Sequence, residues 1–556
     1  MSRAAALILL LALSTCAPRP PQGDERLVLR VGWKGSPDTL NPGTAVLAEA
    51  YTLFELVYDS LYDLELDGSF RLSLAERAES SADGRTWTFH LRPGIAFHDG
   101  HPLSAGDVAF SYRLYREHAD FPYLNTYTRH FESIEAPDSL TVLLRLDEPV
   151  PNLPSRLVFL YVLPAHLWAA HAEGNAAAEF GNEAMVGSGP FRLVRYRQNE
   201  YVQLAANLGH FAFPPRIREV IFQTYRNEDA LVQALRTGQV DMITELPNTA
   251  VRALTGDPKV HFVQGAPFSP EATDIAINQL APEHCPREEG GRCTGHPALR
   301  NLAVRRALAH AVDKRTLIDV VLLGLGTPGL TLIPDGLGDW FNRSLTDLAH
   351  DPETSRRILD EAGYLDRDGD EIREMPGDGR PLVFRLNWPN DLPEAPRMAE
   401  LLAQMWRPIG ISTRLQAVDP DALTAQCCPA FDYDLMIWSW DSDPDPNLLL
   451  GVMTTREIAT GTSESGYANP AYDLLFEEQS RETNPVRRHE LVWRLQQLAF
   501  DDVVYIVPYY ARARQAYRVD RFQGWIIDQP RLALEDVSSL VRIEPVAVTA
   551  APAVQP

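Results

Sequence analysis

The pattern of apolar residues changes twice along this chain, near residues 186 and 273. Before residue 273, short alternating runs such as Leu27–Trp33 predict strands, with few helical stretches between them. After residue 273, strand-like and helix-like runs alternate, as in the apolar run at 432–440 and the amphipathic run at 486–500. Because one hydrophobic core stops growing beyond about 300 residues, a chain of 556 residues must divide into two or three lobes. The sequence therefore predicts an α/β protein with several lobes, one of them rich in strands.

The first 16 residues have the composition of an export signal rather than of a folded element. Arg3 supplies a positive charge, residues 4–13 are apolar, and Leu13-Ser14-Thr15-Cys16 ends the segment. This apolar run is too short for a bilayer span, which takes about 20 residues. A cysteine after small residues is similar to a bacterial lipobox, so we expect Cys16 to carry a lipid that anchors an extracytoplasmic or periplasmic protein. Thr15 departs from the usual Gly, Ala or Ser, and a plain secretory signal is the alternative.

The segments beside both ends are predicted to have no fold of their own. Residues 17–25 contain three prolines and suit a stiff, solvated tether. Residues 546–556, rich in Ala, Val and Pro, are expected to be a disordered tail. Since no later run of 18 apolar residues occurs, we expect no membrane-spanning segment.

The net charge argues against two classes of partner. The formal charge is −24, whereas nucleic acid and anionic lipid demand clustered Lys and Arg. We therefore expect no nucleic-acid partner. We also expect the protein to be a monomer.

Four cysteines besides Cys16 would lie in an oxidising compartment. Cys285 and Cys293 bracket a polar loop of suitable length for a local disulfide. Cys427 and Cys428 are adjacent, so a strained bridge between them and cross-pairing to the 285–293 loop are both open. Zinc is disfavoured because no His or Cys at Cys-x-x-Cys spacing lies beside either pair.

Residues 82–112 combine a strand, two turns and a helix start. Trp87, Phe89 and Leu91 alternate as a strand, Pro-Gly and Asp-Gly turns follow, and Ser104-Ala-Gly-Asp107 has the form of a helix N-terminus. The literal string closely resembles the signature of the family-5 extracytoplasmic solute-binding proteins of peptide-type and nickel-type ABC importers. Further segments, in the same order, are similar to landmarks of that family: 38–42, 187–191, 238–241, 304–308, 358–364, 433–435 and 506–510.

The resemblance implies a bilobed, periplasmic-binding-protein-like type II fold (cluster C) with an extra β-rich domain. Lobe I would comprise 26–61, 187–272 and 503–545, domain II 62–186, and lobe III 273–502. A ligand bound between the lobes would favour the closed state. The closed protein would then dock on the permease subunits of an ABC importer in the cytoplasmic membrane. No Gly-x-x-x-x-Gly-Lys-Ser/Thr loop occurs, so ATP would be handled by other subunits.

The resemblance also implies a ligand site at Trp438, Ser439, Trp440 and Asp441. In peptide-binding members the aspartate of this motif pairs with the ligand's free α-amine, and a carboxylate desolvated on closure can hold an ammonium group by charge-assisted hydrogen bonds. The backbone of 438–440 could pair with an extended peptide. The alternative is that Asp441 caps a turn in Asp-Ser-Asp-Pro-Asp-Pro.

Two departures from the family bear on the ligand. Trp440 replaces a small residue, which predicts a narrower or aromatic-walled pocket. Dipeptide-binding members carry a carboxylate-binding arginine about eight residues before the Arg397-Met-Ala-Glu segment, where this chain has Trp388-Pro-Asn. A strict dipeptide receptor is therefore disfavoured and an oligopeptide is expected. Trp388, Trp438 and Trp440 could instead stack on sugar rings, and a metal chelate is a further alternative.

Other readings of the sequence are weaker. Asp366, Asp368 and Asp370 are spaced like the start of a calcium loop, but no glycine stands at the sixth place and no glutamate at the twelfth, so no cofactor is expected beyond a structural calcium. His98 and His101 flank an expected turn, which disfavours metal binding. Ser188 lies in Gly-Ser-Gly and His-Glu-x-x-His is absent, which disfavours a secreted hydrolase. A ligand sensor would use the same fold without transport.

Overall fold

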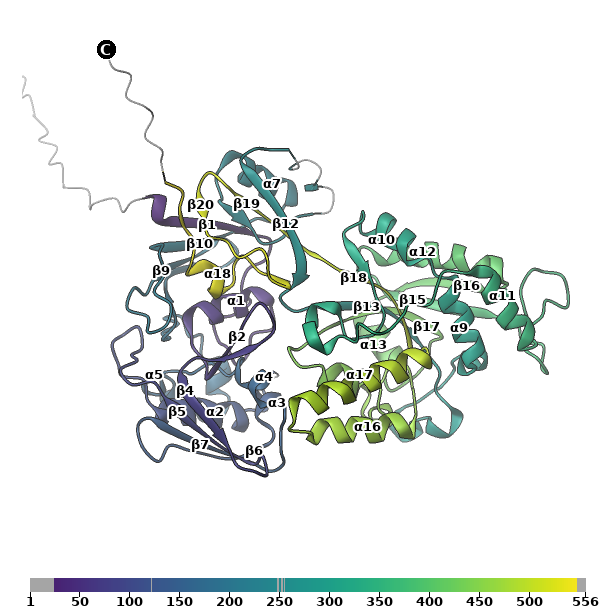
Figure 1. Cartoon of the computed structure of the whole chain (residues 1–556), viewed down its shortest axis with the longest axis horizontal. Coiled ribbons are helices and arrows are strands. Elements are labelled where there is room, and N and C mark those ends of the chain that lie inside the picture. Colours follow the sequence, from purple (N-terminus) through teal and green to yellow (C-terminus); the bar gives the residue numbers. More distant parts are fainter. Residues whose placement is uncertain (1–24, 122, 248–249, 252–253, 255, 548–556) are drawn as a thin grey trace, which may run out of the picture.

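The structure, a computed structural model, describes residues 25–121, 123–247, 250–251, 254 and 256–547 (Figure 1). The predicted signal peptide with Cys16, the tether as far as residue 24, and the tail from residue 548 lie outside the described residues. The N–H of Val546 donates to the carbonyl of Arg521 at 2.9 Å, so the fold includes the first residue assigned to the tail. In the described residues, no helix is both long enough and apolar enough to cross a membrane.

An eight-stranded sheet forms the centre of lobe I. Its strands, in spatial order, are β21 (Arg531–Leu532), β12 (Val260–Pro267), β19 (Ala513–Arg518), β11 (Met242–Ile243), β1 (Val28–Trp33), β10 (Glu219–Thr224), β9 (Tyr201–Ala206) and β8 (Phe191–Arg197). The central strand β1 runs parallel to β10 and β11, and its alternate residues Leu29 and Val31 are fully buried. Around the sheet lie η1 (Glu25–Leu27), α1 (Ala48–Val57), α18 (Val537–Leu540), β20 (Phe522–Gln523) and β22 (Glu544–Pro545).

Helix α7 (Glu228–Thr237) covers one face of this sheet with a small core of its own. The Asn227 side chain accepts from the N–H groups of Asp229 and Ala230, which satisfies donors that the helix leaves unpaired. The helix ends at Gly238, whose φ of 77° is a left-handed conformation that glycine adopts without strain.

Domain II is built on a four-stranded antiparallel sheet. The sheet order is β4 (Ala75–Ser80), β5 (Thr86–Leu91), β7 (Thr141–Leu146) and β6 (Phe131–Glu135), and a separate hairpin pairs β2 (Tyr62–Leu64) with β3 (Phe70–Leu72). Its helices are α2 (Ala105–Glu117), α3 (Leu124–Thr128), α4 (Leu153–Leu157), α5 (Ala165–Trp168), η2 (Ala169–His171) and α6 (Ala176–Glu179). The strand and helix start predicted within residues 82–112 are confirmed, and Ser104 and Asp107 form the reciprocal capping box of α2.

Lobe I and domain II share one hydrophobic core. Leu29 and Phe222 of the large sheet belong to the same buried cluster as Phe89 and Leu144 of domain II. The two regions therefore form one packed body, although they have separate sheets.

Lobe III is a six-stranded mixed sheet with a core on each face. Its order is β14 (Gly326–Pro328), β18 (Tyr505–Ala511), β13 (Glu271–Ile277), β17 (Leu435–Asp441), β15 (Val383–Pro389) and β16 (Ser412–Val418). Its α-helices are α9 (Leu302–Ala311), α10 (Lys314–Val321), α11 (Pro352–Glu361), α12 (Ala395–Trp406), α13 (Pro420–Cys427), α14 (Asn447–Gly451), α15 (Glu457–Thr460), α16 (Pro470–Arg481) and α17 (Pro485–Asp501). Short 3-10 helices complete it: η3 (Pro282–His284), η4 (Arg287–Glu289), η5 (Pro297–Arg300), η6 (Asp335–Trp340) and η7 (Arg407–Ile409).

Two neighbouring strands carry the chain between the sheets. Strand β12 continues into β13 through residues 268–270, and β18 returns to β19 through Arg512. The partners are paired on both sides: β12 is antiparallel to β19 in the first sheet, and β13 to β18 in the second. Figure 1 shows the green lobe III beside the purple, blue and yellow remainder, joined by these strands. The bilobed α/β fold expected from the resemblance is confirmed.

One predicted boundary is wrong. The domain assignment gives 503–545 to lobe I, but β18 pairs with β13 and β14 in the sheet of lobe III. Six of its seven residues are buried there, so the apolar run at 505–510 is a central strand of that sheet. The chain crosses at Arg512, whose guanidinium donates to Asp335 at 2.7 Å and 3.1 Å.

Both remaining cysteine pairs are joined by disulfides. Cys285 is bonded to Cys293, with Cα atoms 6.1 Å apart, and the bridge closes the polar loop. Cys427 is bonded to its neighbour Cys428, so the vicinal alternative is the one that the structure contains.

The Gly187-Ser188-Gly189 segment joins domain II to lobe I at a close backbone contact. The N–H of Gly189 donates to the carbonyl of Val57 at 2.9 Å, and a Cβ at residue 189 would lie 2.7 Å from backbone atoms of Leu56 and Val57. His98 of domain II clamps the same segment, with Nε2 3.0 Å from Gly189 O and Nδ1 accepting from Gly187 N–H. Since the obstructing atoms are backbone, no side-chain adjustment can make room.

We predict that Gly189→Ala destabilises the protein by about 1–3 kcal/mol, because the added methyl group has no space. Urea unfolding, followed by circular dichroism, measures the change. Gly181→Ala is the matched control, since the nearest atom to a Cβ there is a side-chain carbon of Glu183 at 3.7 Å. Equal unfolding midpoints for the two variants would contradict the steric argument.

Candidate functional site

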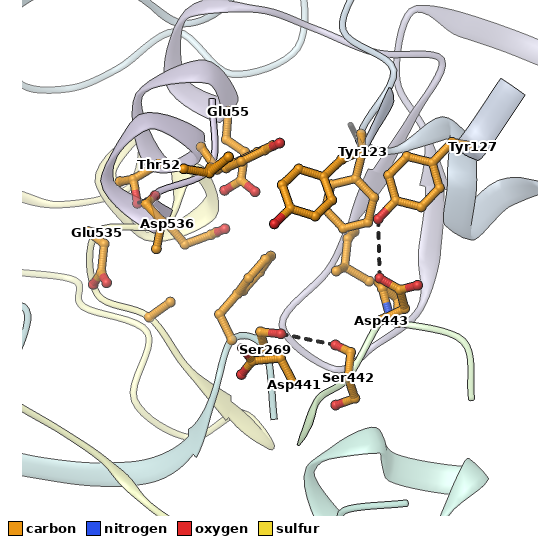
Figure 2. Close-up of a pocket in the computed structure, with 18 residues that line it drawn as sticks. Thr52, Glu55, Tyr123, Tyr127, Ser269, Asp441, Ser442, Asp443, Glu535 and Asp536 are labelled. Atoms are coloured by element: carbon orange, nitrogen blue, oxygen red, sulfur yellow. Dashed lines mark hydrogen bonds between the residues drawn. The ribbon is translucent and has the colours of Figure 1, made fainter. Parts of the chain in front are cut away.

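A cavity of about 450 Å³ lies where the two bodies meet (Figure 2). Lobe I contributes residues of α1 and the segment 533–536, domain II contributes Tyr123 and Tyr127 at α3, and lobe III contributes 441–444, from the last residue of β17 onward. Phe268 and Ser269, in the first crossing between the sheets, form part of the wall. The cavity size is typical of small-molecule sites.

Asp441 is the predicted ligand residue that lines this cavity. It ends β17, where it pairs in register with Glu271 of β13. Among the described residues its carboxylate has no hydrogen-bond or ion-pair partner, and partial burial raises its pKa above the ordinary value. Asp441 therefore does not cap a turn, and its charge is available to a guest.

The other two aspartates of the Asp-Ser-Asp-Pro-Asp-Pro turn are engaged by the protein. Asp443 accepts from the Tyr127 hydroxyl of domain II at 3.2 Å. Asp445 forms a buried bidentate ion pair with Arg488, at 2.6 Å and 2.9 Å, and accepts a weaker bond from Asn152 of domain II. These contacts hold the turn between the two bodies, and Asp441, at the start of the turn, lines the cavity without a partner of its own among the described residues.

Helix α1 presents a polar face to the cavity. Ala48, Tyr51, Thr52 and Glu55 line it, at the spacing that places residues on one side of a helix. Burial raises the pKa of Glu55 well above its usual value, with the nearby acids of lobe I adding to the shift. The opposite residues Leu53 and Phe54 are fully buried, so the core fixes the orientation of the helix.

Two further carboxyls lie opposite α1. Glu535 accepts from Gln515 Nε2 at 2.7 Å, and burial raises its pKa to about 7. Asp536 accepts from the N–H of Ser538 at the start of α18, and burial raises its pKa to about 6. Both are partly desolvated acids without a basic partner among the described residues.

The predicted aromatic residues occupy other places. Trp388 is 7% exposed and belongs to the core of lobe III. Trp438 and Trp440 pack partly against the other lobe III core, and Trp440 Nε1 donates to Glu464 at 2.9 Å. With Ser439, these residues are not among the 18 that line the cavity. The rings that do line it are Tyr51, Tyr123, Tyr127, Phe159 and Phe268.

Sequence reasoning missed most of this lining. Glu55 is an acid within the apolar run Leu53-Phe54-Glu55-Leu56-Val57, and that position was a usable signal. Glu535 and Asp536 follow four buried residues at 531–534. The spacing of apolar residues in the sequence does not distinguish this buried segment from a surface turn. Their proximity to α1 comes from tertiary packing.

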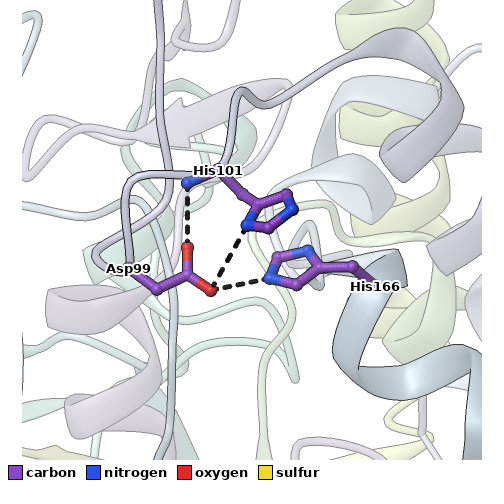
Figure 3. A group of neighbouring side chains, drawn as sticks. All are labelled: Asp99, His101 and His166. Carbon is purple, nitrogen blue, oxygen red and sulfur yellow. Dashed lines mark hydrogen bonds and ion pairs between the residues drawn. The ribbon is translucent and has the colours of Figure 1, made fainter.

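Two groups of side chains could offer donors to a metal. In domain II, Asp99 Oδ2 lies 2.6 Å from His166 Nε2 and 4.0 Å from His101 Nδ1, and the two rings stack with centroids 3.9 Å apart (Figure 3). His98 points away from this group toward Gly189. The group is exposed, and the Asp99–His166 contact ties the Asp-Gly turn to α5.

The predicted calcium loop brings its acids together. Oxygens of Asp366, Asp368, Asp370 and Glu374 lie within 4.8 Å of one another. At the sixth place, where calcium loops carry glycine, Glu371 has a φ of 68° and supplies the same left-handed turn. The three aspartates accept backbone N–H groups of their own loop, so the turn has its own hydrogen bonds. Calcium binding stays a prediction.

Two bodies joined by a pair of strands, with a cavity at their junction, define a bilobed solute-binding protein. The chain belongs to the bacterial extracellular solute-binding proteins, family 5, whose middle-region model matches residues 69–457, more than half of the chain.

Named relatives share most of its length. It is 24% identical over 514 residues to the oligopeptide-binding protein AppA of Bacillus subtilis, covering 90% of this chain and 88% of that protein. It is 24% identical over 506 residues to the nickel-binding periplasmic protein of Escherichia coli, covering 89% and 91%. The solved structure of Bacillus subtilis AppA with a nonapeptide matches with a TM-score of 0.70 at 21% identity, covering 94% of this chain and 99% of that one.

The raised pKa of Glu535 predicts a pH-dependent stability. In the unfolded chain a glutamate ionises near pH 4.3, so between that value and about 7 the folded state holds a proton that the unfolded state has lost. The stabilisation from this group is complete at acid pH and is lost as the pH rises. We expect the unfolding free energy of the wild type, relative to Glu535→Gln, to fall by up to about 1 kcal/mol per pH unit over this range. Urea unfolding at a series of pH values measures it, with exposed Glu353→Gln as control; parallel curves for wild type and Glu535→Gln would refute it.

Proposed function

We propose that this protein captures oligopeptides between its two bodies and delivers them to an ABC permease in the cytoplasmic membrane. The observation that carries the proposal is Asp441: a carboxylate without a protein partner, at a strand end, in a cavity at the junction of the bodies. An ammonium group placed there gains a charge-assisted hydrogen bond in a partly desolvated site. The names of several relatives, which include oligopeptide-binding and di/tripeptide-binding proteins, support the same ligand class.

The two paired crossings support a closing motion. Only residues 268–270 and Arg512 lie between the sheets, so small backbone rotations there would change the angle between the bodies. A ligand that contacts Asp441 on one side and α1 on the other has more contacts when the bodies approach. It therefore shifts the population toward the closed form.

Two parts of the proposal concern location. The family description places its members outside the cell, and Cys16 would anchor this one to the membrane through a lipid.

A metal chelate is the second candidate ligand, because a nickel-binding relative is as similar as an oligopeptide-binding one. An oligosaccharide has less support, since the three tryptophans expected to stack on sugars do not line the cavity.

We predict that tri-alanine with a free amino terminus binds, and that the N-acetylated peptide binds roughly 10- to 100-fold more weakly, as expected for loss of a charged hydrogen bond. In Asp441→Ala the two peptides should bind with equal, weak affinity. Isothermal titration calorimetry measures all four combinations, and exposed Glu353→Ala should behave as wild type.

Native mass spectrometry of the purified protein adds an independent test by identifying any retained ligand. If the wild type binds the free and the N-acetylated peptide with equal affinity, Asp441 does not bind the α-amine. Failure of every peptide to bind, together with binding of a nickel–histidine complex, would replace the peptide by a metal chelate.

A further inference from the structure

Acidic side chains from several elements line the cavity, and no basic side chain is among its described lining residues. Five of its 18 described lining residues are acids, and none is Lys, Arg or His. The acids are Glu55, Asp441, Asp443, Glu535 and Asp536. One ligand ammonium at Asp441 would leave the acids of lobe I unmatched.

Asp443 is the member whose charge the protein already balances in part. Burial raises the pKa of Asp443, and the hydrogen bond from Tyr127 and the nearby guanidinium of Arg156 in domain II oppose that rise. Glu55, Glu535 and Asp536 have no such neighbour. Among the described residues the Glu55 carboxylate has no hydrogen-bond partner at all, and Figure 2 shows it reaching into the cavity between Asp536 and Tyr123.

The spacing of the acids suits an organic cation rather than a metal ion. Oxygens that share one ion must converge, and in the described residues the groups of three or more donors within 4.8 Å lie at Asp99 and at Asp366 instead. The cavity acids are divided between α1, the 535–536 segment and the end of β17. An elongated guest with two separated positive charges can reach two of these places at once.

The rest of the wall suits the stem of a long basic side chain. Tyr51, Tyr123 and Phe268 provide apolar surface for methylene groups, and aromatic faces attract an ammonium or guanidinium group. A peptide with an acidic side chain would meet like charges, which gives discrimination against it.

We propose that the cavity selects peptides with a lysine or arginine side chain at the amino terminus, the α-amine lying at Asp441 and the side-chain cation at Glu55 with Glu535 and Asp536. The proposal rests on the peptide-binding function above. The raised pKa values of these acids agree with it, because burial favours their protonated forms and a bound cation would favour the ionised ones.

The test compares Lys-Ala-Ala with norleucine-Ala-Ala, which has a neutral side chain of similar length, and with Glu-Ala-Ala. We expect the lysine peptide to bind at least about tenfold more tightly than the norleucine peptide, and the glutamate peptide to bind most weakly. In Glu55→Gln the lysine advantage should fall below about threefold, with the norleucine affinity unchanged. Glu49→Gln, on the same helix but outside the lining, should keep the full advantage. Calorimetry gives the affinities and circular dichroism checks folding.

The outcomes separate the two proposals. Equal binding of the lysine and norleucine peptides would overturn cation selection and leave peptide capture standing. A lysine advantage that survives in both Glu55→Gln and Glu535→Gln would overturn the assignment of the cation to these acids. Absence of binding by all three peptides would overturn peptide capture itself, and selection with it. If Glu55→Gln does not fold, Glu535→Gln alone decides the assignment.

Discussion

The architecture depends on the pairing of two antiparallel strands that run through both sheets. Because β12 and β13 lie beside β19 and β18 along their length, the chain passes twice between the bodies at nearly the same place. The bodies have separate hydrophobic cores, so few apolar contacts oppose their relative movement. The cavity lies beside this junction, with Phe268 and Ser269 of the first crossing in its wall.

In the cavity the protein departs from the rule that buried charges are paired. Arg488 and Asp445 follow the rule in a buried bidentate pair. In the cavity, Glu55, Glu535 and Asp536 are partly desolvated without a basic neighbour, which lowers the stability of the empty protein at neutral pH. A cationic guest removes that penalty, so the destabilised groups contribute to affinity.

The sequence predicted the elements better than their assembly. The amphipathic run at 486–500 located α17 to within a residue at each end, because its apolar stripe is strong and Pro485 marks its start. Residues 302–321 form two helices, since α9 ends at Ala311 and the Asp313 side chain caps α10. The boundary at residue 503 failed because periodicity shows that 505–510 is a buried strand but not which sheet it joins. The local motif at Asp441 was found, whereas the tryptophans beside it pack into cores and the acids of lobe I come from distant segments.

Because lobe I and domain II share one core, the proposed closing motion would move only the lobe III wall of the cavity. In that motion Glu55, Glu535 and Tyr127 of α3 would keep fixed mutual positions, while Asp441 would move with lobe III. The distance between Asp441 and Glu55 would then be set by how far the two bodies close. A ligand whose two positive groups are too close together or too far apart would stop closure at the wrong angle between the bodies. Selection among cationic ligands would then depend on the distance between their two charges.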